Sequence, residues 1–134
     1  MFKTKTKRNI RTNKLYEIDV GAHEEMLDAW EKKVLNKLNE LRKLWEIYKR
    51  KHLSTQELRA RGTKEAIDEA IQIEIFKENI ESLFAEAKNE LEAEIRARLR
   101  GEEHNMVVAS RRVSEALDAL EIYAKTWRKE VTKA

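Results

Sequence analysis

The sequence predicts an all-α fold, an elongated bundle of three long helices plus one short helix, with an extended basic N-terminal arm. Its 134 residues include no proline and only three glycines, so most signals that end helices are missing. Apolar residues recur at steps of three or four over long stretches, which is the spacing of one helical face. The length fits one domain, and we expect the arm over residues 1–22 and a helical bundle over residues 23–134.

The first fourteen residues carry six cations and no acid. With Phe2 and Ile10 as its apolar residues, this segment cannot bury enough surface to offset the entropy lost on ordering, so we expect it to be disordered unless a partner holds it. Its charge predicts a polyanionic partner, with nucleic acid first and an acidic protein or a plain solubilising tail as alternatives. The cations predicted to contact phosphates are Lys3, Lys5, Lys7, Arg8, Arg11 and Lys14.

The first long helix is expected to open at Asp19 or His23 and to run to about His52. Acidic residues lie early in this segment and cations lie late, which suits the helix dipole. Its apolar face is predicted from residues spaced three or four apart: Leu27, Trp30, Val34, Leu38, Leu41, Trp45 and Tyr48.

Ser54 followed by Glu57 predicts a capping box that begins a short helix. Gly62 is expected to end that helix in the left-handed conformation, and Thr63 to cap the next one. The third helix is predicted over residues 64–100, until Gly101 interrupts the chain. Its inner side is predicted to be Ile67, Ile71, Phe76, Ile80, Leu83, Ala87, Leu91 and Ile95.

The last helix is predicted from about Glu103 to Thr132, with apolar residues close to a heptad spacing. Such a seam can pack within the chain or against a second copy. Four apolar residues lie off the main stripes and are expected to be exposed in a monomer, which predicts self-association or pairing with a related helical protein. These residues are Leu44, Ile47, Ile73 and Ile75.

Net charge is only +3, but it is unevenly distributed, because residues 65–94 hold ten acids against Lys77 and Lys88. Three further basic clusters are predicted either to extend the phosphate-binding track of the arm or simply to be solvated helix faces. They comprise Arg42, Lys49 and Arg50 in the first helix, Arg96 and Arg100 in the third, and Arg111 and Arg112 in the last.

The sequence predicts no cofactor, no metal site and no membrane span. There are no cysteines, and the three histidines, His23, His52 and His104, have no spacing that sets two ligands on one helix face. No stretch approaches the roughly 20 apolar residues that a membrane span needs.

One alternative is enzymatic. The segment from Arg98 to His104 resembles the arginine–histidine motif of HEPN-domain ribonucleases, which are small helical bundles and commonly dimers. The resemblance implies that the guanidinium stabilises charge on a scissile phosphate and that the imidazole transfers a proton. Leu99 follows Arg98 where that family usually has a polar residue.

The layout of the whole chain, a basic arm followed by long helices without strands, resembles the major capsid proteins of filamentous and rod-shaped archaeal DNA viruses. The resemblance implies helical subunits that pair, stack into a filament and wrap double-stranded DNA. It implies that the arm contacts the DNA and that the protein is located in a virion; a cytoplasmic location is the alternative. The function expected from the sequence is therefore that of a structural protein that coats nucleic acid, and a helical adaptor whose arm docks on an acidic protein is a further alternative.

Overall fold

A computed structural model describes residues 26–132 of the chain. These residues form the helices α2 (Ala29–His52), α3 (Gln56–Arg61), α4 (Lys64–Arg100) and α5 (Glu103–Thr132). No strand occurs within this range, which confirms the all-α prediction. The predicted basic arm, from Lys3 to Lys14, lies outside the described residues.

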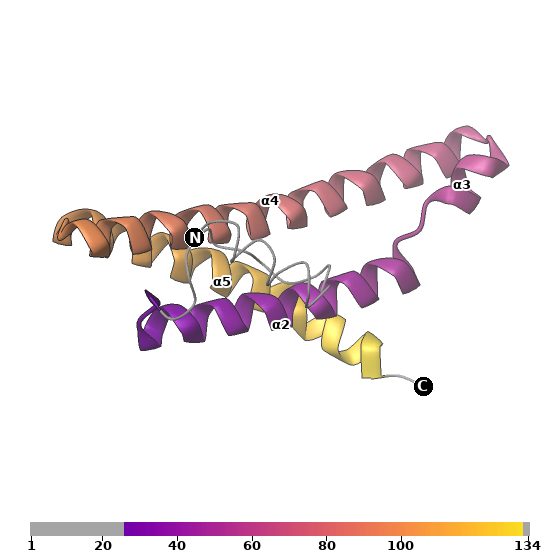
Figure 1. Cartoon of the computed structure of the whole chain (residues 1–134). Helices are drawn as coiled ribbons and strands as arrows, with labels where there is room; N and C mark the ends of the chain where they lie inside the picture. Colours follow the sequence, from indigo (N-terminus) through magenta and orange to yellow (C-terminus); the bar gives the residue numbers. More distant parts are fainter. Residues whose placement is uncertain (1–25, 133–134) are drawn as a thin grey trace, which may run out of the picture.

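The three long helices lie side by side and run in alternating directions (Figure 1). α4 has 37 residues and extends over roughly 55 Å, so the bundle is elongated as predicted. α5 packs along α4 most extensively and also packs on α2, whereas α3 packs on α4. One end of the bundle therefore brings together the start of α2, the end of α4 and the start of α5 (Figure 1).

The long helix α2 begins at Ala29, later than the predicted opening at Asp19 or His23, two residues that lie outside the described range. Asp28 is its N-cap: the Asp28 carboxylate accepts a hydrogen bond from the Glu31 amide at 2.7 Å, and the Glu31 carboxylate accepts one from the Asp28 amide at 2.8 Å. This reciprocal capping box satisfies two amides that have no partner within the helix. The box fixes the start of α2 at a point that the apolar periodicity does not mark.

The predicted capping box at Ser54 and Glu57 is wrong. Thr55 is the N-cap of α3 and makes no side-chain capping bond, because its hydroxyl donates instead to Glu74 of α4 at 2.8 Å. Glu57 pairs with Arg61 one turn later at 3.3 Å. A contact between two helices has therefore replaced the local cap that the sequence suggested.

The other predicted helix ends are confirmed. Gly62 and Gly101 follow α3 and α4 with φ angles of 70° and 72°, a left-handed conformation that glycine adopts without strain. Thr63 caps α4 by accepting a hydrogen bond from the Ala66 amide at 3.2 Å. The bounds of α4 and α5 agree with the predicted ranges.

An aromatic cluster forms the centre of the core. Trp45 of α2 and Trp127 of α5 are both fully buried, with ring centroids 5.1 Å apart, and Phe84 of α4 stacks on Trp127 at 6.4 Å. The three long helices thus meet at three rings, as expected for Trp45 from its position on the apolar stripe of the first long helix. Trp30 is only half-buried and packs at the edge of the core.

The first half of α4 departs from the predicted face. Ala66 and Ala70 are buried there, whereas Ile71, predicted to be inside, is 40% exposed. Ile75 is exposed as predicted, but Leu44 and Ile73 pack against the core, contrary to the expectation that they would be exposed. The reason is that α3 packs against this half of α4. The side of α4 that faces α3 differs from the side that faces α5, so a different stripe of α4 is buried there.

Candidate functional site

The described bundle carries no excess charge, since residues 26–132 contain equal numbers of acidic and basic side chains. The net charge of +3 therefore comes entirely from the residues before and after them. A polyanion would be attracted to the bundle only where its cations gather locally.

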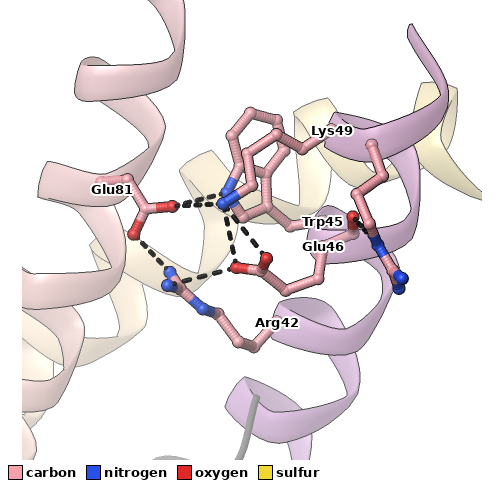
Figure 2. A network of polar contacts seen from close by, with 6 residues as sticks. Arg42, Trp45, Glu46, Lys49 and Glu81 are labelled. Carbon is pink, nitrogen blue, oxygen red and sulfur yellow. Dashed lines mark hydrogen bonds and ion pairs between the residues drawn. The ribbon is translucent and has the colours of Figure 1, made fainter. Parts of the chain in front are cut away.

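Two of the three predicted phosphate-binding residues of α2, Arg42 and Lys49, are engaged with carboxylates (Figure 2). Arg42 donates to Glu81 of α4 at 2.6 Å, and Lys49 lies 3.5 Å from the same carboxylate and 3.1 Å from Glu46. The indole of Trp45 donates to the second oxygen of Glu81 at 2.8 Å. Arg50 is exposed and donates to the backbone oxygen of Glu46 at 3.4 Å.

Glu81 holds this network together. Burial alone would raise the pKa of its carboxyl, but hydrogen bonds from Trp45 and Arg42 outweigh that effect and lower the pKa. Glu81 is thus ionised at neutral pH and compensates the charge of Arg42 and Lys49. The network joins α2 to α4 and leaves these two cations less available to phosphates than the sequence suggested.

A basic hollow lies at the other end of the bundle, between the end of α4 and the start of α5. It has a volume of about 280 Å³, and three of the predicted cations line it: Arg96 and Arg100 from α4 and Arg112 from α5. Two carboxylates, Glu90 and Glu102, line it as well, so the cations exceed the acids there by one. Arg112 lies 3.6 Å from Glu90, whereas Arg96 and Arg100 pair with no carboxylate of residues 26–132. The structure therefore brings together residues that the sequence placed in two separate clusters.

Arg111 is not part of this hollow, although it is adjacent to Arg112 in the sequence. It lines a separate hollow of about 450 Å³ together with Asp28, Trp30 and Glu94. Consecutive residues on a helix point about a quarter turn apart, so the two arginines of α5 face different neighbours. The predicted cations of the bundle are thus divided among three places and do not form one continuous groove.

A buried polar cluster joins the start of α2 to the end of α4. Glu31 has no exposed surface, and Glu94 is 3% exposed. Arg98 donates to both oxygens of Glu31, from Nε at 2.6 Å and from Nη2 at 2.8 Å, and Nη2 also donates to the backbone oxygen of Met26 at 2.7 Å. Asp28 completes the cluster, with its carboxylate 3.5 Å from the guanidinium.

The two buried carboxyls of this cluster have pKa values shifted in opposite directions. Burial opposes the ionisation of Glu31, but the hydrogen bond from Arg98 and its charge hold the pKa of Glu31 below the usual value. Burial, and then the neighbouring Glu31 carboxylate, raise the pKa of the Glu94 carboxyl to about 8. The pair therefore shares one negative charge at neutral pH, with Glu31 ionised and Glu94 protonated.

The two residues of the ribonuclease hypothesis lie in different surroundings. Arg98 is bound to Glu31, Asp28 and the Met26 carbonyl, so its guanidinium serves the packing of α4 against the start of α2. His104 is exposed in the first turn of α5. Cleavage of RNA by this pair stays a prediction.

Sequence reasoning missed Glu31 and Glu94 as members of a site. The signal for Glu31 was its position three residues after Asp28, which is the capping-box spacing. Glu94 lies three residues after the buried Leu91, on the same stripe of α4, but it resembled the other acids of residues 65–94. Nothing local distinguishes a buried glutamate from an exposed one in such a stretch.

Comparisons of the chain with protein-family models, with curated proteins and with solved structures found no match. Within residues 26–132, no helix combines the length and the apolar character needed to cross a bilayer.

Proposed function

We propose that this protein is a structural subunit that coats nucleic acid, with double-stranded DNA as the preferred polyanion, in a filamentous assembly such as a viral capsid. The arm neutralises phosphates through its six cations, and the hollow of Arg96, Arg100 and Arg112 supplies a second phosphate contact. The virion is the location that this proposal implies.

One observation carries the proposal: the positive charge of the chain is concentrated and not spread. The bundle is neutral overall, whereas residues 1–14 hold six cations and no acid. Binding driven by such a segment is electrostatic and largely independent of base sequence, since phosphate contacts fix position and carry no sequence information.

The second contact is supported by geometry. Arg96 and Arg100 are one turn apart on α4 and exposed, and Arg112 reaches the same hollow from α5. Guanidinium groups bind phosphate oxygens with paired hydrogen bonds, so three of them around one hollow suit a phosphate group. Asn105 lines the hollow as well. Its side-chain amide donates one hydrogen to Glu102 at 3.0 Å, which leaves the second hydrogen for a phosphate oxygen.

Assembly is proposed to use apolar residues that the bundle leaves uncovered. Ile75 of α4 is 46% exposed and Ile122 of α5 is 68% exposed. Covering such residues between copies adds a favourable term for each contact, and a filament holds many weak contacts in register along one nucleic acid.

The test of the arm replaces its six cations with glutamine in the full chain and measures affinity for a short labelled DNA duplex by fluorescence anisotropy. We expect a loss of at least about tenfold in affinity at low salt, and a slope of log K against log salt that decreases in magnitude by about 5. Negative-stain microscopy of the unmodified chain with duplex DNA is expected to show regular filaments that the variant does not form.

The matched control replaces six exposed lysines of the bundle with glutamine, so that net charge changes equally. These residues are Lys32, Lys33, Lys51, Lys64, Lys125 and Lys129. An equal loss of affinity in the control would show that net charge matters and the arm does not. Unchanged DNA binding by the arm variant, together with capture of an acidic protein, would support the adaptor alternative instead.

The hollow is tested by replacing Arg96, Arg100 and Arg112 together with glutamine. We expect the affinity for duplex DNA to fall about three- to tenfold and the salt slope to decrease in magnitude by up to about 3, because up to three phosphate contacts are lost. A control that replaces Arg61, Lys51 and Lys125 removes the same charge from exposed positions elsewhere. If both variants bind DNA equally well, the hollow has no role in binding.

A further inference from the structure

Three carboxylates from two helices converge in the buried cluster between α2 and α4. Asp28, Glu31 and Glu94 each place one carboxylate oxygen within 4.8 Å of the other two. Glu31 and Glu94 are buried, and Asp28 is half-buried. The only cation paired with these carboxylates among the described residues is Arg98, which donates two hydrogen bonds to Glu31 and lies 3.5 Å from the Asp28 carboxylate.

One oxygen of this cluster has no hydrogen-bond partner. Oε1 of Glu94 is buried and receives no donor from residues 26–132, although the residue is only 3% exposed. Glu31 differs, because both of its oxygens accept hydrogen bonds. A buried oxygen without a partner costs free energy and is uncommon in proteins, so a water or an ion bound to it in solution would remove that cost.

We infer that Asp28, Glu31 and Glu94 bind a divalent cation of the Ca²⁺ type. Hard cations prefer carboxylate oxygens, and two oxygens bound to one Ca²⁺ at its usual bond length lie at most about 5 Å apart. The separations in the cluster fall within that limit. Mg²⁺ demands near-ideal octahedral geometry and gives up its waters reluctantly, so three carboxylates from two helices suit it less well than Ca²⁺.

Charge also favours a divalent ion. Binding displaces the proton of Glu94. The three ionised carboxylates then carry three negative charges against two guanidinium groups, that of Arg98 in the cluster and that of Arg111 in the adjoining hollow, so a cation is still attracted. Glu31 can still coordinate a cation although it is hydrogen-bonded. It accepts three hydrogen bonds, whereas a carboxylate offers about four lone-pair positions. The hollow of about 450 Å³ beside Asp28 and Glu94 gives water access to the coordination positions that the protein leaves open.

The site is independent of the proposed nucleic-acid contacts, since Arg96, Arg100 and Arg112 line a different hollow. A bound cation would tie the N-cap of α2 to the last turns of α4. The sequence predicted no metal site because its ligands combine a capping box with a residue from another helix and match no local motif.

The cation is tested with the full chain, first dialysed against EDTA and then titrated with CaCl₂ at constant ionic strength. We expect the Tm to rise by at least about 5 °C at millimolar Ca²⁺, and less with Mg²⁺, since a ligand that binds only the folded state stabilises it by mass action. Tb³⁺, a luminescent substitute for Ca²⁺, is expected to be sensitised by Trp30, which lines the adjoining hollow.

Glu94→Gln and Asp28→Asn are the test variants, because each removes one charged ligand while keeping the side-chain shape. Both are expected to lose the rise in Tm and most of the Tb³⁺ signal. Glu86→Gln, at an exposed position of α4, is the control and should keep both. The inference fails if Ca²⁺ does not raise the Tm of the unmodified chain, which is the result expected if Glu94 and Glu31 merely share a proton. It also fails if the Tm of Glu94→Gln rises as much as that of the unmodified chain.

Discussion

Replacing Arg98 with methionine will lower the free energy of unfolding by about 3–5 kcal/mol, the cost of leaving a buried charge without its partner. Glu31 has no exposed surface, and Arg98 supplies two of its three hydrogen bonds. Methionine keeps much of the volume and none of the charge, so the loss comes mainly from the stranded carboxylate. Chemical denaturation monitored by circular dichroism measures the loss, and the Tm is expected to fall by more than about 10 °C.

Arg96→Met is the matched control, because Arg96 lies two residues earlier on α4 and is exposed. Its effect should stay within about 0.5 kcal/mol. The double variant Glu31→Gln with Arg98→Met removes both charges, and we expect it to be more stable than Arg98→Met alone. If Arg98→Met and Arg96→Met cost the same, the buried pair does not hold the two helices together.

In the presence of EDTA, the protein will lose stability as pH rises from about 5 to 9, and Glu94→Gln will remove that loss. The pKa of Glu94 is raised to about 8 from its ordinary value of 4.5. Between these two pH values the folded state binds more protons than the unfolded state, so stability is complete below pH 4.5 and falls as pH rises through 8. The full shift corresponds to roughly 3–5 kcal/mol.

The groups that face Glu94 are Glu31 and Asp28 from the start of α2, Arg98 from α4 and Arg111 from α5. The pKa of Glu31 is lowered, so its contribution is present above pH 4.5 and is lost only as pH falls further. The two carboxyls therefore act in separate pH ranges. Parallel curves of stability against pH for the unmodified chain and Glu94→Gln would contradict this prediction, because they would show that the pKa of Glu94 is not raised by folding.

Much of the secondary structure followed from local signals. The apolar spacing predicted three long helices, and Gly62, Thr63 and Gly101 marked their ends as found. The prediction from local signals was wrong where a contact between helices replaced a local one. The Thr55 hydroxyl donates to Glu74 of α4, and the predicted cap at Ser54 does not form. The start of α2 was misplaced because Leu27, before the capping box, continues the apolar pattern.

The candidate sites were only partly predictable. The cations of the hollow were all named from the sequence, but their grouping was not, since Arg112 joins Arg96 and Arg100 whereas Arg111 faces elsewhere. That division depends on the rotation of α5 about its own axis when it packs on α4. Arg42 and Lys49 were expected to be available to phosphates, and Glu81 from α4 engages both.

The sequence by itself determined the all-α class, the lengths of α4 and α5 and the concentration of positive charge in residues 1–14. These properties depend only on residue type and on spacing along the chain. Apolar spacing and helix-ending residues set where helices form, and the count of ionisable side chains sets the charge. Only the tertiary structure decided which charges are buried and which ones meet. Glu31 and Arg98 are 67 residues apart in the sequence. They meet because α2 and α4 pack with a particular rotation about their axes and a particular offset along them, and no local sequence pattern specifies either quantity.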